Sequence, residues 1–200
     1  MIMMKLSIFF REYLNHYAYQ YLDHAETEKW QELSMQDEQS FTKIFGADKI
    51  DEMVFSEFLD YFLICKVMGG KYCMKKSVRV MKKLSSWLKE KQYTDEDYQE
   101  YFKEASDLPN VGELAELIYE HAMKSPEKEY DEILDGYFSV LHLENKKLWL
   151  EEELGDGTNI GPVFVSKEIS DLCKPGWTLN LVIGKDKTGW YILESGNVYR

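Results

Sequence analysis

Positive side chains recur through residues 71–91 at the spacing of one helix face. The segment holds eight Lys or Arg and a single acid, Glu90, so its formal charge is +7. Side chains three and four positions apart lie on the same side of an α-helix. A row of cations on such a side suits phosphate contacts, because each neutralised phosphate releases counterions. The sequence predicts a nucleic-acid-binding face made of Lys75, Lys76, Arg79, Lys82 and Lys83.

The other side of the same segment is apolar, which predicts a helix packed against a core. A solvated Lys face that meets an acidic protein is the alternative interpretation. The chain has three arginines, at 11, 79 and 200, and Arg paired with guanine is the commonest base-specific contact. We therefore expect weakly sequence-selective contact with duplex DNA. The residues expected on the buried side are Cys73, Ser77, Val80, Met81, Leu84, Trp87 and Leu88.

The chain as a whole is acidic. It has 200 residues, 44% of them hydrophobic, and a net charge of −12, so the residues outside 71–91 carry −19. A chain of this length buries enough surface to fold without disulfides or metal, and its three cysteines form no close pair. It has no run of about 18 apolar residues to span a bilayer. Residues 1–10 are apolar but lack a cleavage site, so we expect a cytoplasmic protein without membrane contact.

Hydrophobic residues recur with a period near 3.6 up to about residue 125, which predicts a helical bundle domain over 1–135. Glycine supports this division, with four before residue 126 and eight after it. Ser125-Pro126-Glu127 has the residue types of a helix start, so a last helix is expected to end at Gly136. The other expected helices are 10–21, 30–45, 55–67, 71–91, 94–105 and 114–121.

From Tyr137 the period changes to two, which predicts short strands. The expected strands are 137–144, 147–153, 163–165, 177–183 and 190–194, with a Gly-rich loop at 154–162 and a helical turn at 166–173. Closing five short strands removes their exposed edges, so a small, mostly antiparallel β-barrel domain, SH3-like or OB-like, is expected over 136–200. Trp177 and Trp190 fall on its apolar side. The predicted fold class is therefore α+β.

Two stretches flank the Gly69-Gly70 break: FSEFLDYF at 55–62 and SVRVMKKLSSWLKEKQY at 77–93. Together they resemble the SAM-like, four-helix core-binding domain of tyrosine recombinases over residues 10–105. In that family the helix at the place of 71–91 lies along DNA, so the resemblance implies a DNA-contacting helix. It does not imply recombination, because the family's catalytic domain needs two arginines and Arg200 is the only one after residue 79.

No catalytic, cofactor or metal motif is present, so neither an enzyme activity nor a cofactor is expected. The four histidines lack the spacing of a helical metal site. Glu151 to Glu153 with Asp156 could offer oxygen ligands, but strand alternation sends Glu152 to the opposite face. The alternative function is a protein-interaction adaptor that uses the barrel or the Tyr-rich helices around Tyr13, Tyr17 and Tyr21.

Overall fold

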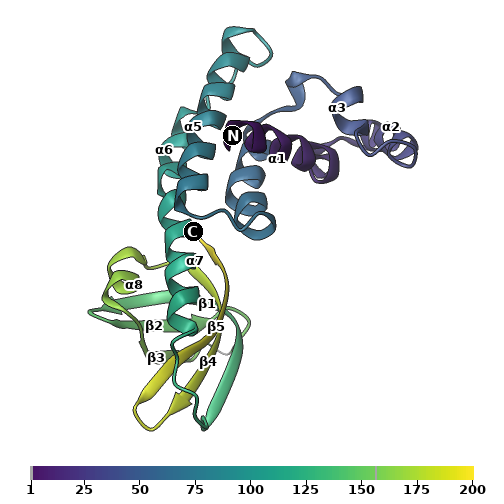
Figure 1. Cartoon of the computed structure of the whole chain (residues 1–200). Coiled ribbons are helices and arrows are strands. Elements are labelled where there is room, and N and C mark those ends of the chain that lie inside the picture. The colour runs from purple at the N-terminus through teal and green to yellow at the C-terminus, as the bar shows by residue number, and fades with distance from the viewer. Residues whose placement is uncertain (1, 156) are drawn as a thin grey trace. The chain divides into compact units, whose positions relative to one another are not determined.

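The protein is α+β, with a helical N-terminal half followed by a five-stranded sheet (Figure 1). The computed structural model describes residues 2–155 and 157–200, and side chains from residue 6 onward. Contacts divide the described chain into two compact units. The first contains the residues up to Val67 and Tyr72–Ser106, and the second contains Met68–Lys71 and Asp107–Arg200.

All regular elements as far as Asp107 are helices. Their hydrophobic faces meet in an aromatic core where Tyr13 and Phe58 are fully buried and their ring centroids lie 5.5 Å apart. Phe62 joins them at 5.6 Å from Tyr13. The helices are α1 Ile2–His16, η1 Ala18–Tyr21, α2 His24–Ser34, α3 Ser40–Ile44, η2 Ala47–Lys49, α4 Glu52–Ser56, η3 Glu57–Lys66, α5 Lys71–Glu90, α6 Gln99–Glu104 and η4 Ala105–Asp107.

The apolar segment at 55–67 is wider than a regular α-helix. After α4 it continues as the π-helix η3, in which the Val67 N–H donates to the Phe62 carbonyl oxygen five residues earlier, at 3.2 Å. Such segments are rare and short in most proteins. Here the wider turn buries five large side chains along ten residues. These are Phe58, Leu59, Phe62, Leu63 and Ile64.

Five strands form the sheet of the second unit. They are β1 Glu132–Glu144, β2 Lys147–Glu152, β3 Asn159–Phe164, β4 Thr178–Asp186 and β5 Gly189–Tyr199. The strand order β1-β2-β3-β5-β4 closes on itself because β1 pairs with both β2 and β4. Only β3 and β5 are parallel among the described pairs. Alternate residues such as Leu179, Leu181 and Ile183 are buried, as the period of two predicts.

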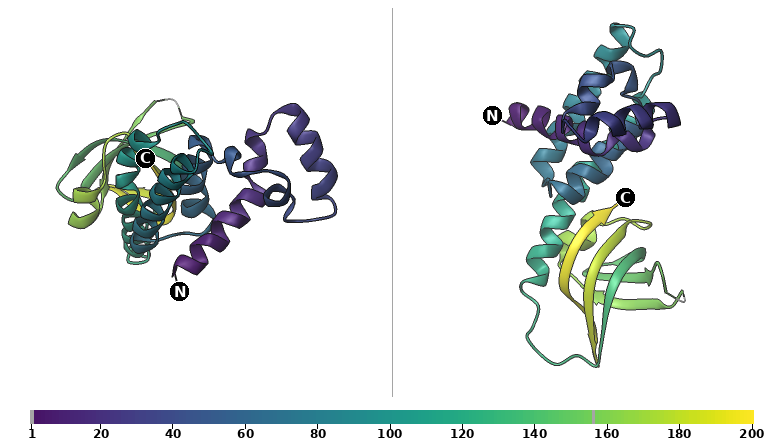
Figure 2. Two further views of the ribbon diagram at one scale, coloured as in Figure 1. Left: turned by 90° about the horizontal axis from the view of Figure 1, so that it is seen from above. Right: turned by 90° about the vertical axis from the view of Figure 1, so that its right-hand side faces the viewer.

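Two helices accompany the sheet. α7 (Leu108–Ala122) packs against β5 and α8 (Lys167–Leu172), and α8 connects β3 to β4 (Figures 1 and 2). The Ser166 side chain caps α8 by accepting from the Ile169 N–H. His121 on α7 lies 3.1 Å from the Phe164 carbonyl oxygen on β3. α7 therefore belongs with the sheet, whereas the sequence placed it with the bundle and put the division at residue 135.

Several expectations from periodicity need correction. No helix forms over 125–136: β1 begins at Glu132, where backbone pairing with β4 replaces the local helix signals, and the Asp131 N–H already donates to the Lys185 carbonyl oxygen at 2.8 Å. The stretch 30–45 is two helices, α2 and α3, and the helix expected from residue 94 begins at Gln99. β3 begins at Asn159, inside the expected loop. None of the described helices is long and apolar enough to cross a membrane.

Candidate nucleic-acid interface

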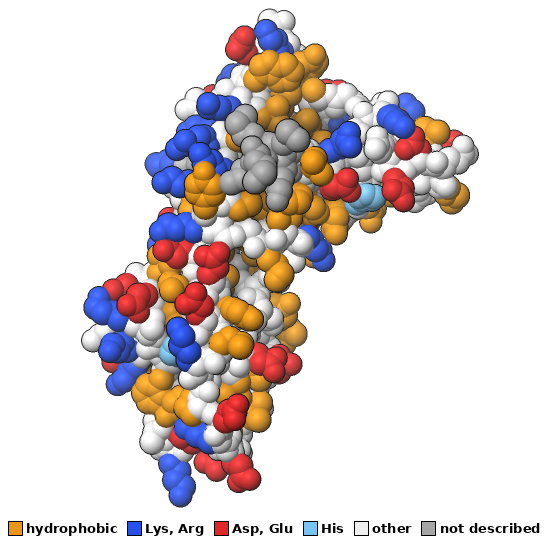
Figure 3. Space-filling model, viewed as in Figure 1, with side chains coloured by type: hydrophobic (Ala, Val, Ile, Leu, Met, Phe, Trp, Pro, Cys, Tyr) orange, Lys and Arg blue, Asp and Glu red, His pale blue; other side chains and the backbone are white. Residues whose placement is uncertain are grey.

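The predicted cations all lie on α5, which runs unbroken from Lys71 to Glu90. Four of them are exposed and Lys76 is partly exposed, with its Nζ 5.3 Å from the centre of the Tyr72 ring. Figure 3 shows Lys and Arg side chains gathered over α5. We call this surface the basic face; it consists of Lys75, Lys76, Arg79, Lys82 and Lys83.

The side of α5 opposite the basic face is buried, but it is not quite the predicted one. Met74 and Ser85 are buried, whereas Trp87 is 45% exposed. Three other residues expected on the buried side are only partly buried: Cys73, Val80 and Leu84. At 100° per residue the buried stripe is turned by about 60° from the predicted one. This rotation about the helix axis places the centre of the buried stripe opposite the cations. Its members are Met74, Ser77, Met81, Ser85 and Leu88.

Two buried serines do not leave unsatisfied hydroxyls inside this stripe. The Ser77 hydroxyl donates to the Cys73 carbonyl oxygen at 2.9 Å, and the Ser85 hydroxyl donates to the Lys82 carbonyl oxygen at 2.9 Å. Bonds of this kind let a Ser sit in a helix interior at small cost. Both buried hydroxyls are therefore satisfied within α5 itself.

The three cations of residues 71–91 that lie outside the basic face form ion pairs with carboxylates. Lys71 pairs with Glu113, Lys89 with Asp97, and Lys91 with Glu90, at 2.6, 2.9 and 3.4 Å between nitrogen and oxygen. Within the described part of the chain, no member of the basic face has an ion pair with a carboxylate. The hydrogen bond from Lys89 lowers the pKa of Asp97. Three of the eight cations are thus neutralised locally and five are not.

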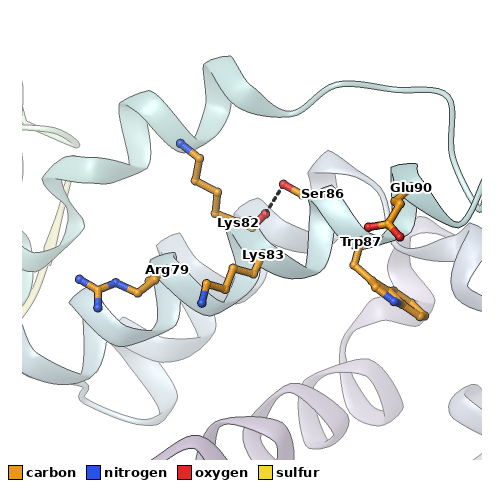
Figure 4. Close-up of a pocket in the computed structure, with 6 residues that line it drawn as sticks. All are labelled: Arg79, Lys82, Lys83, Ser86, Trp87 and Glu90. Atoms are coloured by element: carbon orange, nitrogen blue, oxygen red, sulfur yellow. Dashed lines mark hydrogen bonds between the residues drawn. The ribbon is translucent and has the colours of Figure 1, made fainter.

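A shallow hollow of about 400 Å³ lies on the outer side of α5 (Figure 4). Arg79, Lys83 and Trp87 follow one another at intervals of four residues along it. Figure 4 shows the hydroxyl of Ser86 bonded back to the Lys82 carbonyl oxygen, at 3.0 Å. The lining residues are Arg79, Lys82, Lys83, Ser86, Trp87 and Glu90, which are three cations, one hydroxyl, one indole and one carboxylate.

The C-terminal end of α5 places a second aromatic ring beside Trp87. The Tyr93 N–H donates to the Leu88 carbonyl oxygen and the Gln92 N–H to the Lys89 carbonyl oxygen, both at 3.0 Å. With Gln92 in the left-handed region at a φ of 60°, this is the Schellman arrangement that ends helices. The Tyr93 ring is 48% exposed, and its centroid lies 5.7 Å from that of Trp87.

Other candidate sites do not assemble in the described residues. A second hollow is lined by Ser139, Glu151 to Glu153, Gly155 and Gly157, so strand alternation does not separate the three glutamates as expected. Asp156 lies outside the described residues. Glu153 accepts hydrogen bonds from Ser139 and Thr178 at 3.1 and 2.6 Å. In the described part of the chain no three His, Cys, Asp or Glu side chains are placed to hold a metal ion.

The tyrosines of the first helices do not form one surface. Tyr13 is fully buried, Tyr17 is partly buried and Tyr21 is 37% exposed, with its hydroxyl donating to Glu57 at 3.2 Å. Burial raises the pKa of Tyr21 to about 12. Trp177 and Trp190 are both buried, as the strand pattern predicts. The exposed aromatic pair at Trp87 and Tyr93 was missed, because Trp87 fits the apolar period of α5.

Comparison with protein-family models, with curated proteins and with solved structures finds no match to this chain.

Proposed function

We propose that this protein binds nucleic acid through the phosphate backbone, with the basic face of α5 as the contact surface. The supporting observation is that five cations, all at least partly exposed and without ion pairs in the described chain, lie opposite the buried stripe of the same helix. A helix held by one side and charged on the other can be laid along a phosphate backbone. The resemblance to the recombinase core-binding domain is part of the same proposal.

Overall acidity does not oppose this function. Interactions between exposed charges fade beyond about 8 Å at physiological salt, so those carboxylates of the remaining chain that lie farther than this from α5 act weakly on a ligand held there. Arg79 is the only arginine in the basic face, and lysine contacts phosphate as a point charge without reading bases. We therefore expect binding that is sensitive to salt and only weakly selective for sequence.

We further propose that the closed sheet is an OB-like barrel. Support comes from its five strands in the order β1-β2-β3-β5-β4 and from the helix that joins β3 to β4. OB barrels have five strands in a Greek-key arrangement and often carry oligonucleotides or oligosaccharides. This architecture is compatible with a nucleic-acid-binding protein, although the basic face lies in the other unit.

The test compares two triple variants that lower the net charge equally. Lys75→Glu/Arg79→Glu/Lys82→Glu changes the basic face. Lys29→Glu/Lys103→Glu/Lys187→Glu changes exposed lysines elsewhere. Fluorescence anisotropy with a labelled duplex of about 20 base pairs at about 50 mM salt should show binding by the wild type and the control triple, and a loss of at least about 100-fold in the face triple.

Equal loss in the two triples would show that net charge alone matters, and a wild type that binds neither the duplex nor a single strand of the same length would refute the proposal. Circular dichroism spectra of both triples check that the helices remain. Because all six positions are exposed, we expect the fold to survive.

A protein-interaction adaptor is the second candidate, and one observation favours it. Ile133, Tyr137 and Leu141 recur every four residues along β1 and are 59, 43 and 41% exposed. Such a row suits the apolar centre of an interface. A stoichiometric partner that stays bound after nuclease treatment, and that is lost when Tyr137 and Leu141 become Ser, would favour this function over nucleic-acid binding.

A further inference from the structure

We infer that Trp87 and Tyr93 form a stacking surface for unpaired bases, so that the preferred ligand of the basic face is single-stranded nucleic acid. This inference rests on the proposed function and deepens it. We call the two side chains the aromatic pair. Its rings are 45 and 48% exposed, although both are large side chains that proteins usually bury more fully.

The aromatic pair continues the row of cations. Arg79, Lys83 and Trp87 are spaced by four residues and line the same hollow. Positions four apart on a helix are about 6 Å apart along its axis. A strand whose phosphates contact Arg79 and Lys83 would therefore present its next base near the indole. A positively charged surface combined with aromatic side chains is the usual construction of single-strand binding grooves.

Hydrogen bonds fix the backbone that carries the pair before any ligand binds. Trp87 belongs to the last turn of α5, and the Lys91 N–H donates to its carbonyl oxygen at 2.9 Å. The Schellman bond from the Tyr93 N–H to Leu88 fixes the backbone of the second ring. The ring planes are inclined at 37°, so they form a tilted shelf and not a closed stack. A backbone that is already ordered loses little conformational entropy on binding.

Unpaired bases are the part of a nucleic acid that such a shelf recognises. In a duplex the faces of the bases are covered by their neighbours, and only a single strand or an opened end exposes them to a side chain. Phosphate contacts alone do not distinguish these ligands, because both carry the same backbone groups. The aromatic pair is therefore expected to set the preference for single strands, and the cations to set the general affinity.

Charge favours nucleic acid over an apolar peptide as the occupant. Three of the six residues lining the hollow are cations that lack ion pairs within the described chain, and the opposing carboxylate, Glu90, is 3.4 Å from Lys91. Burying these cations against an uncharged surface would cost desolvation without compensation. A phosphate backbone supplies the compensating charge and the bases supply the planar surfaces.

The experiment measures binding of labelled oligo-dT and oligo-U of about 15 nucleotides, and of a duplex of the same length, at about 50 mM salt. The DNA and RNA strands show which backbone is preferred. The variants are Trp87→Ala, Trp87→Phe and Tyr93→Ala. Tyr119→Ala is the control, since Tyr119 on α7 is 58% exposed and lies outside the hollow.

Trp87→Ala and Tyr93→Ala should each weaken single-strand binding about 10-fold and change duplex binding less than about twofold. Trp87→Phe should retain most of the affinity, while the quenching of tryptophan fluorescence that the strand causes in the wild type should disappear. Tyr119→Ala should resemble the wild type for every ligand.

Equal losses for strand and duplex, or no loss for the strand, would overturn the inference while leaving the proposed function intact if duplex binding persists. If the protein binds none of the three probes, both the inference and the proposed function are overturned. Retention of strand-induced quenching in Trp87→Phe would show that the bases stack elsewhere.

Discussion

Glu90 is the one carboxylate among the residues that line the basic hollow. It is exposed and lies 3.4 Å from the Nζ of Lys91, an exposed pair that water and salt weaken. Its position at the end of the helix, near the negative end of the helix dipole, gives it no stabilising role for α5. We therefore attribute to Glu90 a cost in binding phosphate and no compensating gain in folding.

Replacing Glu90 with Gln should strengthen binding of single strands and duplexes alike, by up to about fivefold at low salt, because a unit charge about 4 Å from a phosphate costs about 1 kcal/mol in water. Anisotropy titrations of Glu90→Gln and wild type measure this. Asp95→Gln, which removes an exposed carboxylate not lining the hollow, is the control. Weaker binding by Glu90→Gln would contradict a phosphate ligand in the hollow.

At the scale of elements, α5 shows how tertiary packing selects among faces that its sequence allows. Its apolar residues span more than half of the helix circumference. Periodicity therefore predicts that one side is buried, but it does not determine which residues lie at the centre of that side. Packing selects the flexible Met74 and the small Ser85 and leaves the bulky Trp87 outside. The basic face depends less on which side of α5 is buried, because its lysines are at least partly exposed with either the predicted or the observed buried side.

This choice of face can be checked through stability. Met74 is fully buried, so Met74→Ala should lower the free energy of unfolding by about 2–5 kcal/mol, whereas Trp87→Ala should lower it by less than about 1 kcal/mol. Urea unfolding followed by circular dichroism gives both values. A cost for Trp87→Ala that equals or exceeds that of Met74→Ala would mean that the predicted stripe, centred nearer Trp87, is the buried one.

The sheet could be predicted in outline but not at its boundaries. Alternation placed Trp177 and Trp190 inside, and both are buried. The Ser125-Pro126-Glu127 signal for a helix failed because local capping groups compete with pairing partners that are distant in sequence, such as Asp135 of β1 opposite Val182 of β4. The association of α7 with β5 also depends on contacts between residues that are far apart in the sequence, so no local sequence pattern predicts it.

For the whole molecule, the net charge of −12 divides into +7 over residues 71–91 and −19 elsewhere. Composition therefore indicated where a polyanion-binding surface is expected, and the structure adds which of the eight cations lack ion pairs within the described chain. What composition could not indicate is the aromatic pair, because its exposure depends on how α5 is turned and on how the chain leaves the helix at Gln92.

The dependence of affinity on salt tests most directly the claim that the basic face binds phosphates. Five cation–phosphate contacts predict that log K for duplex DNA falls with log salt concentration with a slope of about −4.5. In Lys75→Gln/Arg79→Gln/Lys82→Gln two contacts remain, and the slope should approach about −1.8. A wild-type slope near zero, or one that the three substitutions leave unchanged, would contradict the account.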